Sequence, residues 1–187
     1  MKQVTAFDLS VLCSEHGLRE CGEVVRDCPA YVARIEGETR EAVAEWWPES
    51  AVDWVSAHML ALMWGESRLN RCGVGPGGRK VLGMKGKNPH RYTESELRGY
   101  LKALRSSSRV DLGPGQILWR YARSPNGRRA TVDEMIGADA VRVVAYNLHL
   151  RKRGNRDPWG YWPGVKYNET YVRKVARIAA KLMRGKP

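Results

Sequence analysis

The sequence has no run of about 18 or more apolar residues, the length that a membrane-spanning helix requires. Its opening residues, Met1 to Asp8, lack the long apolar core of a secretory signal peptide. We find neither an internal repeat nor a low-complexity tract, which excludes repeat arrays and fibrous chains. We therefore expect a globular chain without an export signal of its own.

Acidic residues are scarce relative to basic ones: 20 Asp and Glu stand against 32 Lys and Arg, which gives a net charge of +12. Such a surface attracts anionic partners through its long-range field. The candidates are nucleic acid, the anionic polymers of a bacterial envelope, or no partner at all. The densest basic cluster, Arg151 to Arg153, has no recognition-helix or RNA-binding motif beside it, so we expect no specific nucleic-acid partner.

The 187 residues suffice for one hydrophobic core, or for one core with a small appendage. Apolar residues make up 43% of the chain, which favours a folded protein over disorder. Helical patterns dominate, so the expected fold is mainly α with a small hairpin or loop insert. We divide the chain into a helical N-terminal region, residues 1–48, and a main domain, residues 49–187, on which the first region is expected to pack.

Local signals set the expected elements of the main domain. Ser50, with Asp53 three residues later, is typical of a capping box and starts a helix that runs to about Arg68. Residues 71–91 are rich in Gly, Lys and Arg and predict a loop or short hairpin, with residues 80–85 as its strand-like piece. Three further helix starts follow, at Thr93 with Glu96, at Thr131 with Glu134, and at Asn168.

Four cysteines occupy positions 13, 21, 28 and 72. Cys13, His16, Cys21 and Cys28 offer four ligands to zinc, although their spacing is not that of a standard zinc finger. Disulfides are the alternative if the protein works outside the cytoplasm. We expect reduced, buried thiols, because a free cysteine commonly behaves as a small apolar side chain.

Glu66 ends an apolar helical stripe whose members recur at steps of three and four: Val52, Val55, Met59 and Leu62. A carboxylate that continues such a stripe should be partly stripped of water, and desolvation raises its pKa. A carboxylic acid that stays protonated near neutral pH can protonate the leaving oxygen of a sugar. The alternative, a solvated glutamate at a helix end, is the commoner case.

The segment from Asp111 to Gln116 contains two glycines and a proline, so it predicts a tight turn rather than a helix interior. Glycine there allows the backbone to approach a ligand closely. The Gln116 amide offers a donor and an acceptor, which suits the N-acetyl and hydroxyl groups of a sugar. Asp111 is expected to cap the turn, unless it faces the same cleft as Glu66.

Residues 66–70 read Glu-Ser-Arg-Leu-Asn, and residues 111–117 read Asp-Leu-Gly-Pro-Gly-Gln-Ile. In this order they resemble the lytic transglycosylase family of lysozyme-like enzymes. That family carries Glu-Ser-x-x-Asn at the end of an apolar helix and a later segment of the Asp-x-Gly-x-x-Gln-Ile type. The last helix, from Tyr171, fits the same pattern. The resemblance covers about residues 50–184 and implies an α+β lysozyme-like fold for residues 49–187.

Some stretches depart from the family pattern. The chain between Glu66 and Gln116 is longer, with a Gly-rich insert at residues 72–80 and an extra helix, and Gly-Pro-Gly-Gln replaces the usual Gly-Leu-Met-Gln. The family's Tyr-Asn-x-Gly motif is split between two places. Tyr146 is followed by Asn but lacks the Gly, whereas Tyr161 has the Gly but lacks the Asn.

Aromatic residues gather in the loop of residues 157–164, which holds two tryptophans and a tyrosine. Their rings could stack on sugars or anchor the loop to the core. A tyrosine is expected to donate a hydrogen bond to Glu66 and tune it, and we favour Tyr161 over Tyr146 and Tyr167.

The resemblance implies cleavage of the β-1,4 bond between N-acetylmuramic acid and N-acetylglucosamine in peptidoglycan. Glu66 would act as general acid and then as base on the muramic acid 6-hydroxyl, which forms a 1,6-anhydro ring. The residues expected to contact substrate are Ser67, Asp111, Gln116, Tyr146 and Tyr161. The rival interpretations are a hydrolytic muramidase that uses Asp111 as second carboxylate, a non-enzymatic wall-binding virion protein, and a basic nucleic-acid-binding protein.

This chemistry requires no cofactor and no metal, and we expect a monomer. The expected partners are bacterial peptidoglycan and the anionic polymers of the envelope. Because no export signal is seen, we expect the protein to be made in the cytoplasm and to reach the wall after lysis, as a phage endolysin does, or as part of a virion.

Overall fold

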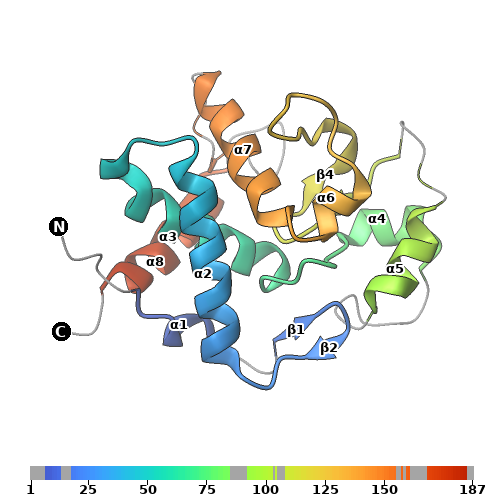
Figure 1. Ribbon diagram of the computed structural model, residues 1–187, viewed down its shortest axis with the longest axis horizontal. Coiled ribbons are helices and arrows are strands. Elements are labelled where there is room, and N and C mark those ends of the chain that lie inside the picture. The colour runs from blue at the N-terminus through green and yellow to red at the C-terminus, as the bar shows by residue number, and fades with distance from the viewer. Residues whose placement is uncertain are drawn as a thin grey trace.

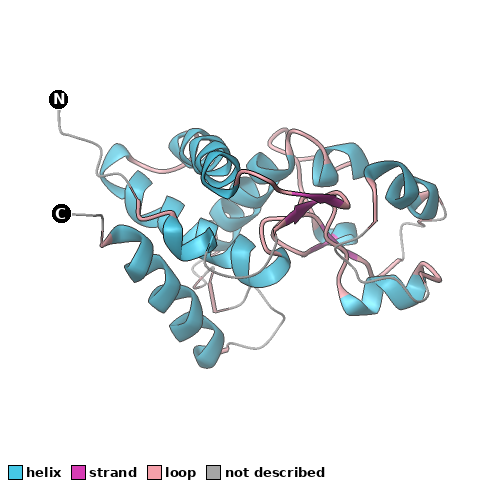
Figure 2. Ribbon diagram, turned by 90° about the horizontal axis from the view of Figure 1, so that it is seen from below, coloured by secondary structure: helices cyan, strands magenta, loops and turns pink. Residues whose placement is uncertain are grey.

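The computed structural model describes residues 7–13, 18–84, 92–102, 104, 108–154, 157, 159–160 and 168–184. With 59% helix and 7% strand in two small antiparallel hairpins, it confirms the expected mainly α, α+β fold class. The helices are α1 (Ser10–Cys13), α2 (Cys28–Ala44), α3 (Glu49–Ser67), α4 (Pro76–Val81), α5 (Glu94–Leu101), α6 (Val132–Ile136), α7 (Ala140–Arg153) and α8 (Glu169–Met183), as labelled in Figure 1. The strands are β1 (Arg19–Glu20), β2 (Glu23–Val24), β3 (Asp111–Leu112) and β4 (Ile117–Leu118), drawn in magenta in Figure 2.

Helix α3 is the most deeply buried element. Every residue from Val55 to Trp64 is buried, which is typical of a helix that is apolar all round. Both α2 and α8 pack against α3, and α7 packs on α2. Each buried leucine or methionine contributes roughly 1.5–3 kcal/mol of transfer free energy. This packing fixes the last turn of α3, where Glu66 lies.

The start of α3 differs from the expected one. Pro48 is the N-cap residue, no side chain caps the helix, and the first turn begins at Glu49. The predicted capping box of Ser50 and Asp53 is therefore wrong. The Asp53 carboxylate forms an ion pair with Arg40 of α2 instead. The side chain that the sequence predicted to cap α3 therefore stabilises the contact between α2 and α3.

The end of α3 turns the chain sharply. Arg68 and Leu69 both adopt the left-handed conformation, with φ values of 57° and 64°. The backbone N–H of Leu69 donates to the carbonyl of Met63 over 3.3 Å, which satisfies a carbonyl of the last turn. The Arg68 guanidinium lies 3.7 Å from the centre of the Trp64 ring. The loop of residues 70–75 is thereby directed toward the β3–β4 hairpin.

The N-terminal region shares its core with the main domain, because the buried residues of both form one hydrophobic cluster. Helix α2 contacts α3 and α7, and α1 contacts α2 and α8. The start of α2 is capped by Asp27, whose carboxylate accepts from the backbone N–H of Ala30. Arg142 of α7 forms an ion pair with Glu45, just beyond α2, over 2.8 Å.

The four cysteines form two disulfides, Cys13 with Cys28 and Cys21 with Cys72. The expectation of reduced thiols is wrong, and the zinc alternative loses its three sulfur ligands. The first disulfide joins α1 to the start of α2. The second joins the turn of the β1–β2 hairpin to the loop after α3. Between its two cysteines, the Oδ1 atom of Asn70 accepts from the backbone N–H of Cys21 over 3.1 Å and of Cys72 over 2.9 Å.

The hairpin next to α3 is formed by β3 and β4, on either side of the predicted tight turn. Val74 forms a further antiparallel bridge with Leu112, so the loop after α3 lies beside β3. The hairpin expected within residues 71–91 is replaced in its first half by α4, with Pro76 in the first turn, where proline is well tolerated. Residues 85–91 lie outside the described part.

The other predicted helix starts are confirmed. Thr93 with Glu96 and Thr131 with Glu134 form complete capping boxes, and Asn168 caps α8. Thr131 caps only the short α6, however, and the next helix begins at Ala140. Within the described residues, no helix combines the length and the apolarity that crossing a membrane would need.

Candidate functional site

Glu66 lies in the last turn of α3, against the first turns of α8. The hydroxyl of Tyr171 donates a hydrogen bond to its Oε1 atom. The two helices pack closely along this stretch (Figure 1). The sequence placed Tyr171 only at the start of the last helix, yet it is Tyr171 that donates the hydrogen bond for which the sequence favoured Tyr161. Tyr161 and Tyr167 lie outside the described residues.

The pKa of the Glu66 carboxyl is raised above its ordinary value, mainly because burial disfavours the charged form. The Tyr171 hydrogen bond and the positive charge of Lys174 act in the opposite direction. The negative charge of Asp111 raises the pKa further, so Asp111 lies close enough to act on Glu66. Burial also raises the pKa of Asp111 itself. A half-buried carboxyl of this kind keeps its proton to higher pH than a solvated glutamate.

Asp111 and Gln116 lie together against the loop after α3. A Cβ atom added at Gly75 would lie 3.0 Å from the Oδ2 atom of Asp111 and 3.1 Å from the Oε1 atom of Gln116. One added at Gly73 would lie 2.8 Å from the Nε2 atom of Gln116. These two glycines belong to the Gly-rich insert, for which the sequence predicted a loop or short hairpin. Their missing side chains make room for the two polar residues, and this could not be read from the insert alone.

Gln116 holds a strained position in the turn. Its φ of 49° is left-handed, which non-glycine residues seldom adopt. Its Nε2 donates to the carbonyl of Gly113 over 2.8 Å, so the amide nitrogen is engaged within the turn. The Oε1 atom is left as the acceptor that a ligand N–H or hydroxyl can use. Strain of this kind collects at functional sites.

Ser67 has a structural position in this site. The sequence predicted contact with substrate, yet the residue is only 2% exposed. Its hydroxyl lies 2.8 Å from the carbonyl of Pro114 and 3.2 Å from that of Met63. The side chain therefore fastens the end of α3, next to Glu66, to the β3–β4 turn.

Tyr146 packs elsewhere. Its ring lies 4.9 Å from that of Trp46, centre to centre. The neighbouring Asn147 is also occupied by packing: its Oδ1 accepts from the backbone N–H of Arg123, and its Nδ2 donates to the carbonyls of Arg123 and Val143. Neither side chain has a described contact with Glu66, so the first half of the split motif serves the α7 interface.

The aromatic loop is anchored where it is described. Trp159 is 7% exposed, and its ring lies 5.4 Å from His58 and 6.1 Å from Trp54, both on α3. This favours the anchoring role for Trp159. Residues 161–164 lie outside the described part, so stacking of their rings on a sugar stays a prediction.

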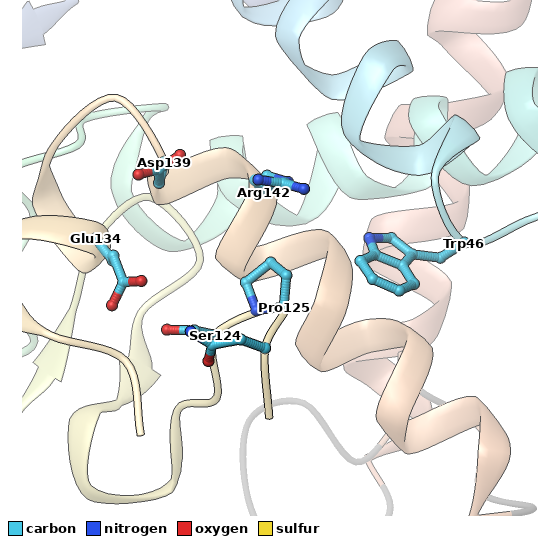
Figure 3. Close-up of a pocket in the computed structure, with 7 residues that line it drawn as sticks. Trp46, Ser124, Pro125, Glu134, Asp139 and Arg142 are labelled. Carbon is cyan, nitrogen blue, oxygen red and sulfur yellow. The ribbon is translucent and has the colours of Figure 1, made fainter. Parts of the chain in front are cut away.

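Among the described residues, no cluster of three or more His, Cys, Asp or Glu side chains is arranged to hold a metal. His16, the remaining ligand of the zinc alternative, lies outside them. A pocket of about 380 Å³ lies apart from Glu66, between the end of α2, the segment 124–126 and the start of α7. Figure 3 shows its lining, with Trp46 across from Glu134 and Asp139. It shares no residue with the group of Glu66, Tyr171, Asp111 and Gln116, which we call the Glu66 site.

We expect the Tyr171→Phe variant to move the alkaline limb of the pH–rate profile to higher pH. Loss of the hydroxyl removes a donor that stabilises the carboxylate, and such bonds to charged groups contribute about 1.5–3 kcal/mol. The pKa of Glu66 then rises further, and the protonated acid persists to higher pH. Lys174→Met should act in the same direction. The measurement is kcat/KM against pH on soluble wall fragments.

The matched control is Tyr146→Phe, which removes the same hydroxyl from a ring that packs on Trp46. Its alkaline limb should stay in place. A Tyr171→Phe profile that coincides with the wild-type profile, or moves to lower pH, would contradict the assignment of Tyr171 as the residue that tunes Glu66.

Comparison of the chain with protein-family models, with curated proteins and with solved structures found no match. The functional assignment therefore depends on the residues of the Glu66 site.

Proposed function

We propose that this protein is a glycosidase that cleaves the β-1,4 bond between N-acetylmuramic acid and N-acetylglucosamine in bacterial peptidoglycan. The observation that carries the proposal is the half-buried carboxyl of Glu66, with its raised pKa, its tyrosine hydrogen bond and the charge of Asp111 acting on it. The sequence resemblance to lytic transglycosylases supports the choice of substrate.

The hydrogen bond from Tyr171 leaves the two oxygens of Glu66 in different roles. Oε1 accepts the hydrogen bond of the Tyr171 hydroxyl, so the acid proton is carried by Oε2. Oε2 donates it to the bridging oxygen as the glycosidic bond breaks, and the N-acetylglucosamine hydroxyl leaves. The carboxylate then accepts the proton of the muramic acid 6-hydroxyl, whose oxygen closes on C1 to give the 1,6-anhydro ring. One carboxyl group serves both steps, and no water is consumed.

A hydrolytic muramidase is the second candidate, and the electrostatic effect of Asp111 on Glu66 favours it. Hydrolysis uses a second carboxylate to stabilise the oxocarbenium charge, to form a glycosyl intermediate or to activate water. Asp111 is the acidic residue on the facing hairpin, with Gln116 beside it. The same acid step by Glu66 begins both reactions, so the two candidates differ in what attacks C1.

Asp111→Asn separates the two candidates. For a transglycosylase we expect the rate of the variant to stay within about tenfold of the wild-type rate, and the variant to release anhydro-muramic ends as the wild type does. Its alkaline limb should move to lower pH, because a negative charge that raises the pKa of Glu66 is lost. For a hydrolase we expect ordinary reducing ends from the wild type and a rate loss of roughly 10²-fold or more in the variant, as for loss of a catalytic group. Mass spectrometry of the released fragments distinguishes them by one water.

The disulfides support a place of action outside the reducing cytoplasm. Bonds such as Cys13–Cys28 and Cys21–Cys72 form and persist in oxidising surroundings. A wall substrate places the enzyme in such surroundings, whether it arrives after lysis or on a virion.

A further inference from the structure

A strip of arginines and aromatic rings follows the β3–β4 hairpin directly. It consists of Trp119, Arg120, Tyr121, Arg123 and Arg129, and we call it the arginine strip. It lies between β4 and α6 in Figure 1. Arg120 is four residues from Gln116, so their Cα atoms are at most about 14 Å apart. Arg120 therefore lies close to Gln116 of the Glu66 site.

Contacts within the strip hold its charges in place. The Arg120 guanidinium lies 4.6 Å from the centre of the Tyr121 ring and donates to the Tyr121 hydroxyl over 2.7 Å. The Arg129 guanidinium lies 5.6 Å from the centre of the Trp119 ring. Arg123 and Arg129 are partners in an antiparallel bridge, which puts their side chains on the same face. Fixing long side chains in advance lowers the entropy cost of binding a ligand.

The charges of the strip are not neutralised by neighbours. Among the described residues, Arg120, Arg123 and Arg129 form no ion pair with an acidic side chain. Arg128, within the same segment, does pair with Glu134 over 2.9 Å. The three positive charges are thus not offset by an ion pair, although Arg120 and Arg123 are half-buried and also donate to the Tyr121 hydroxyl and to the Ala122 carbonyl. Arginine matches the geometry of phosphate well.

The exposure of the Trp119 and Tyr121 rings indicates which kind of polyanion the strip can bind. Proteins that bind single-stranded nucleic acid use open aromatic faces on which bases stack. Here a guanidinium covers one face of Tyr121 and one face of Trp119, and the Trp119 indole N–H is bonded to the carbonyl of Ala130 over 3.1 Å. Tyr121 is exposed, but its ring stands alone, because Trp119 is only partly exposed. A single ring cannot stack the successive bases of a nucleic acid, so the strip suits a phosphate polymer without bases better.

We propose that the arginine strip binds a phosphate-bearing polymer of the bacterial wall, of the poly(glycerol phosphate) type, and holds the protein on the wall beside the bond that it cleaves. The inference rests on the proposed function for its location. The binding itself depends only on the strip.

The test measures binding of purified poly(glycerol phosphate) to the wild-type protein at several salt concentrations. The strip variant is Arg120→Gln, Arg123→Gln and Arg129→Gln together. The control variant, Arg177→Gln, Lys181→Gln and Arg184→Gln, removes three positive charges from exposed positions on α8 and its C-cap. The two variants have the same net charge, and thermal unfolding checks that both remain folded.

We expect the strip variant to bind roughly 10–100-fold more weakly and its salt slope to fall by two to three, about one for each lost phosphate contact. The control variant should stay within about threefold of the parent protein. Equal losses in both variants would overturn the proposal, because net charge alone would then explain binding. Single-stranded DNA that binds more tightly than the polymer, with the same dependence on the strip, would replace it with a nucleic-acid site.

A second measurement separates this inference from the proposed function. On walls stripped of their phosphate polymers, the strip variant should release fragments at the wild-type rate. If the wild-type protein releases fragments but the strip variant binds the polymer as tightly as the wild type does, the inference is wrong and the proposed function stands. If the wild-type protein binds the polymer through the strip but releases no fragments, the glycosidase assignment is wrong and the inference stands.

Discussion

Replacing Glu66 by glutamine should lower the rate of fragment release from purified peptidoglycan by roughly 10²–10⁴-fold, the contribution of a positioned general acid. The amide cannot supply the proton that the leaving oxygen needs. Its carbonyl oxygen can still accept the hydrogen bond of Tyr171, so the surroundings need not rearrange. The initial rate of soluble fragment release, compared between variant and wild type, measures the effect.

The same variant should be more stable than the wild type at neutral pH. A carboxyl whose pKa is raised by folding contributes stability that is fully present below its unfolded pKa and is lost as the pH rises through its folded pKa. At pH 7 the buried charge of Glu66 therefore costs free energy of folding, and glutamine removes that cost. We expect the midpoint of thermal unfolding to rise by a few degrees at pH 7, and the difference to shrink below about pH 4, where the unfolded glutamate is also protonated.

Glu23→Gln, on the exposed β2 strand, is the control and should change neither quantity. A Glu66→Gln protein that kept a substantial part of its rate would remove Glu66 from the catalytic role. A variant that lost both its activity and its fold would say nothing about catalysis by Glu66. The predicted rise in the midpoint of thermal unfolding therefore checks that the variant is folded.

Removal of the Cys21–Cys72 disulfide should lower both the free energy of unfolding and the activity. Its sequence separation is 51 residues, and a loop of that size is expected to contribute about 4 kcal/mol to the free energy of unfolding. Cys72 is followed by Gly73 and Gly75, which pack against Gln116 and Asp111. We expect the double variant Cys21→Ser, Cys72→Ser to lose roughly that stability in chemical denaturation and also to lose activity at temperatures where it remains folded.

The control is the Cys13–Cys28 disulfide, with a separation of 15 residues and an expected contribution of about 3 kcal/mol. It joins α1 to the start of α2, and the described part of the structure shows no contact between it and the β3–β4 hairpin. The double variant Cys13→Ser, Cys28→Ser should lose a comparable amount of stability while its folded fraction keeps the wild-type rate. Equal loss of specific activity in both variants would contradict a local effect of Cys21–Cys72 on the Glu66 site.

Features set by neighbouring residues could be predicted from the sequence. The apolar stripe that ends at Glu66 predicted a buried helix, and the capping boxes at Thr93 and Thr131 follow from residues three positions apart. The raised pKa of Glu66 follows from the same stripe. In each case the residues concerned lie within one helix and its cap.

Features that depend on distant residues could not be predicted. Tyr171 and Glu66 are 105 positions apart, and only the packing of α8 on α3 brings the hydroxyl to the carboxylate. The cysteine pairing likewise needs the folded chain, since Cys21 and Cys72 lie on separate elements. Within the Gly-rich insert, glycines and lysines favoured a loop, whereas Pro76 at the first turn allowed the helix α4.

The most direct test of the central claim is mass spectrometry of the fragments that the wild-type protein releases from purified peptidoglycan free of other wall polymers. We predict disaccharide-peptide fragments cut between N-acetylmuramic acid and N-acetylglucosamine, with anhydro-muramic ends, and none from Glu66→Gln. Fragments cut only in the peptide stems, or no release by a folded wild-type protein, would contradict the account.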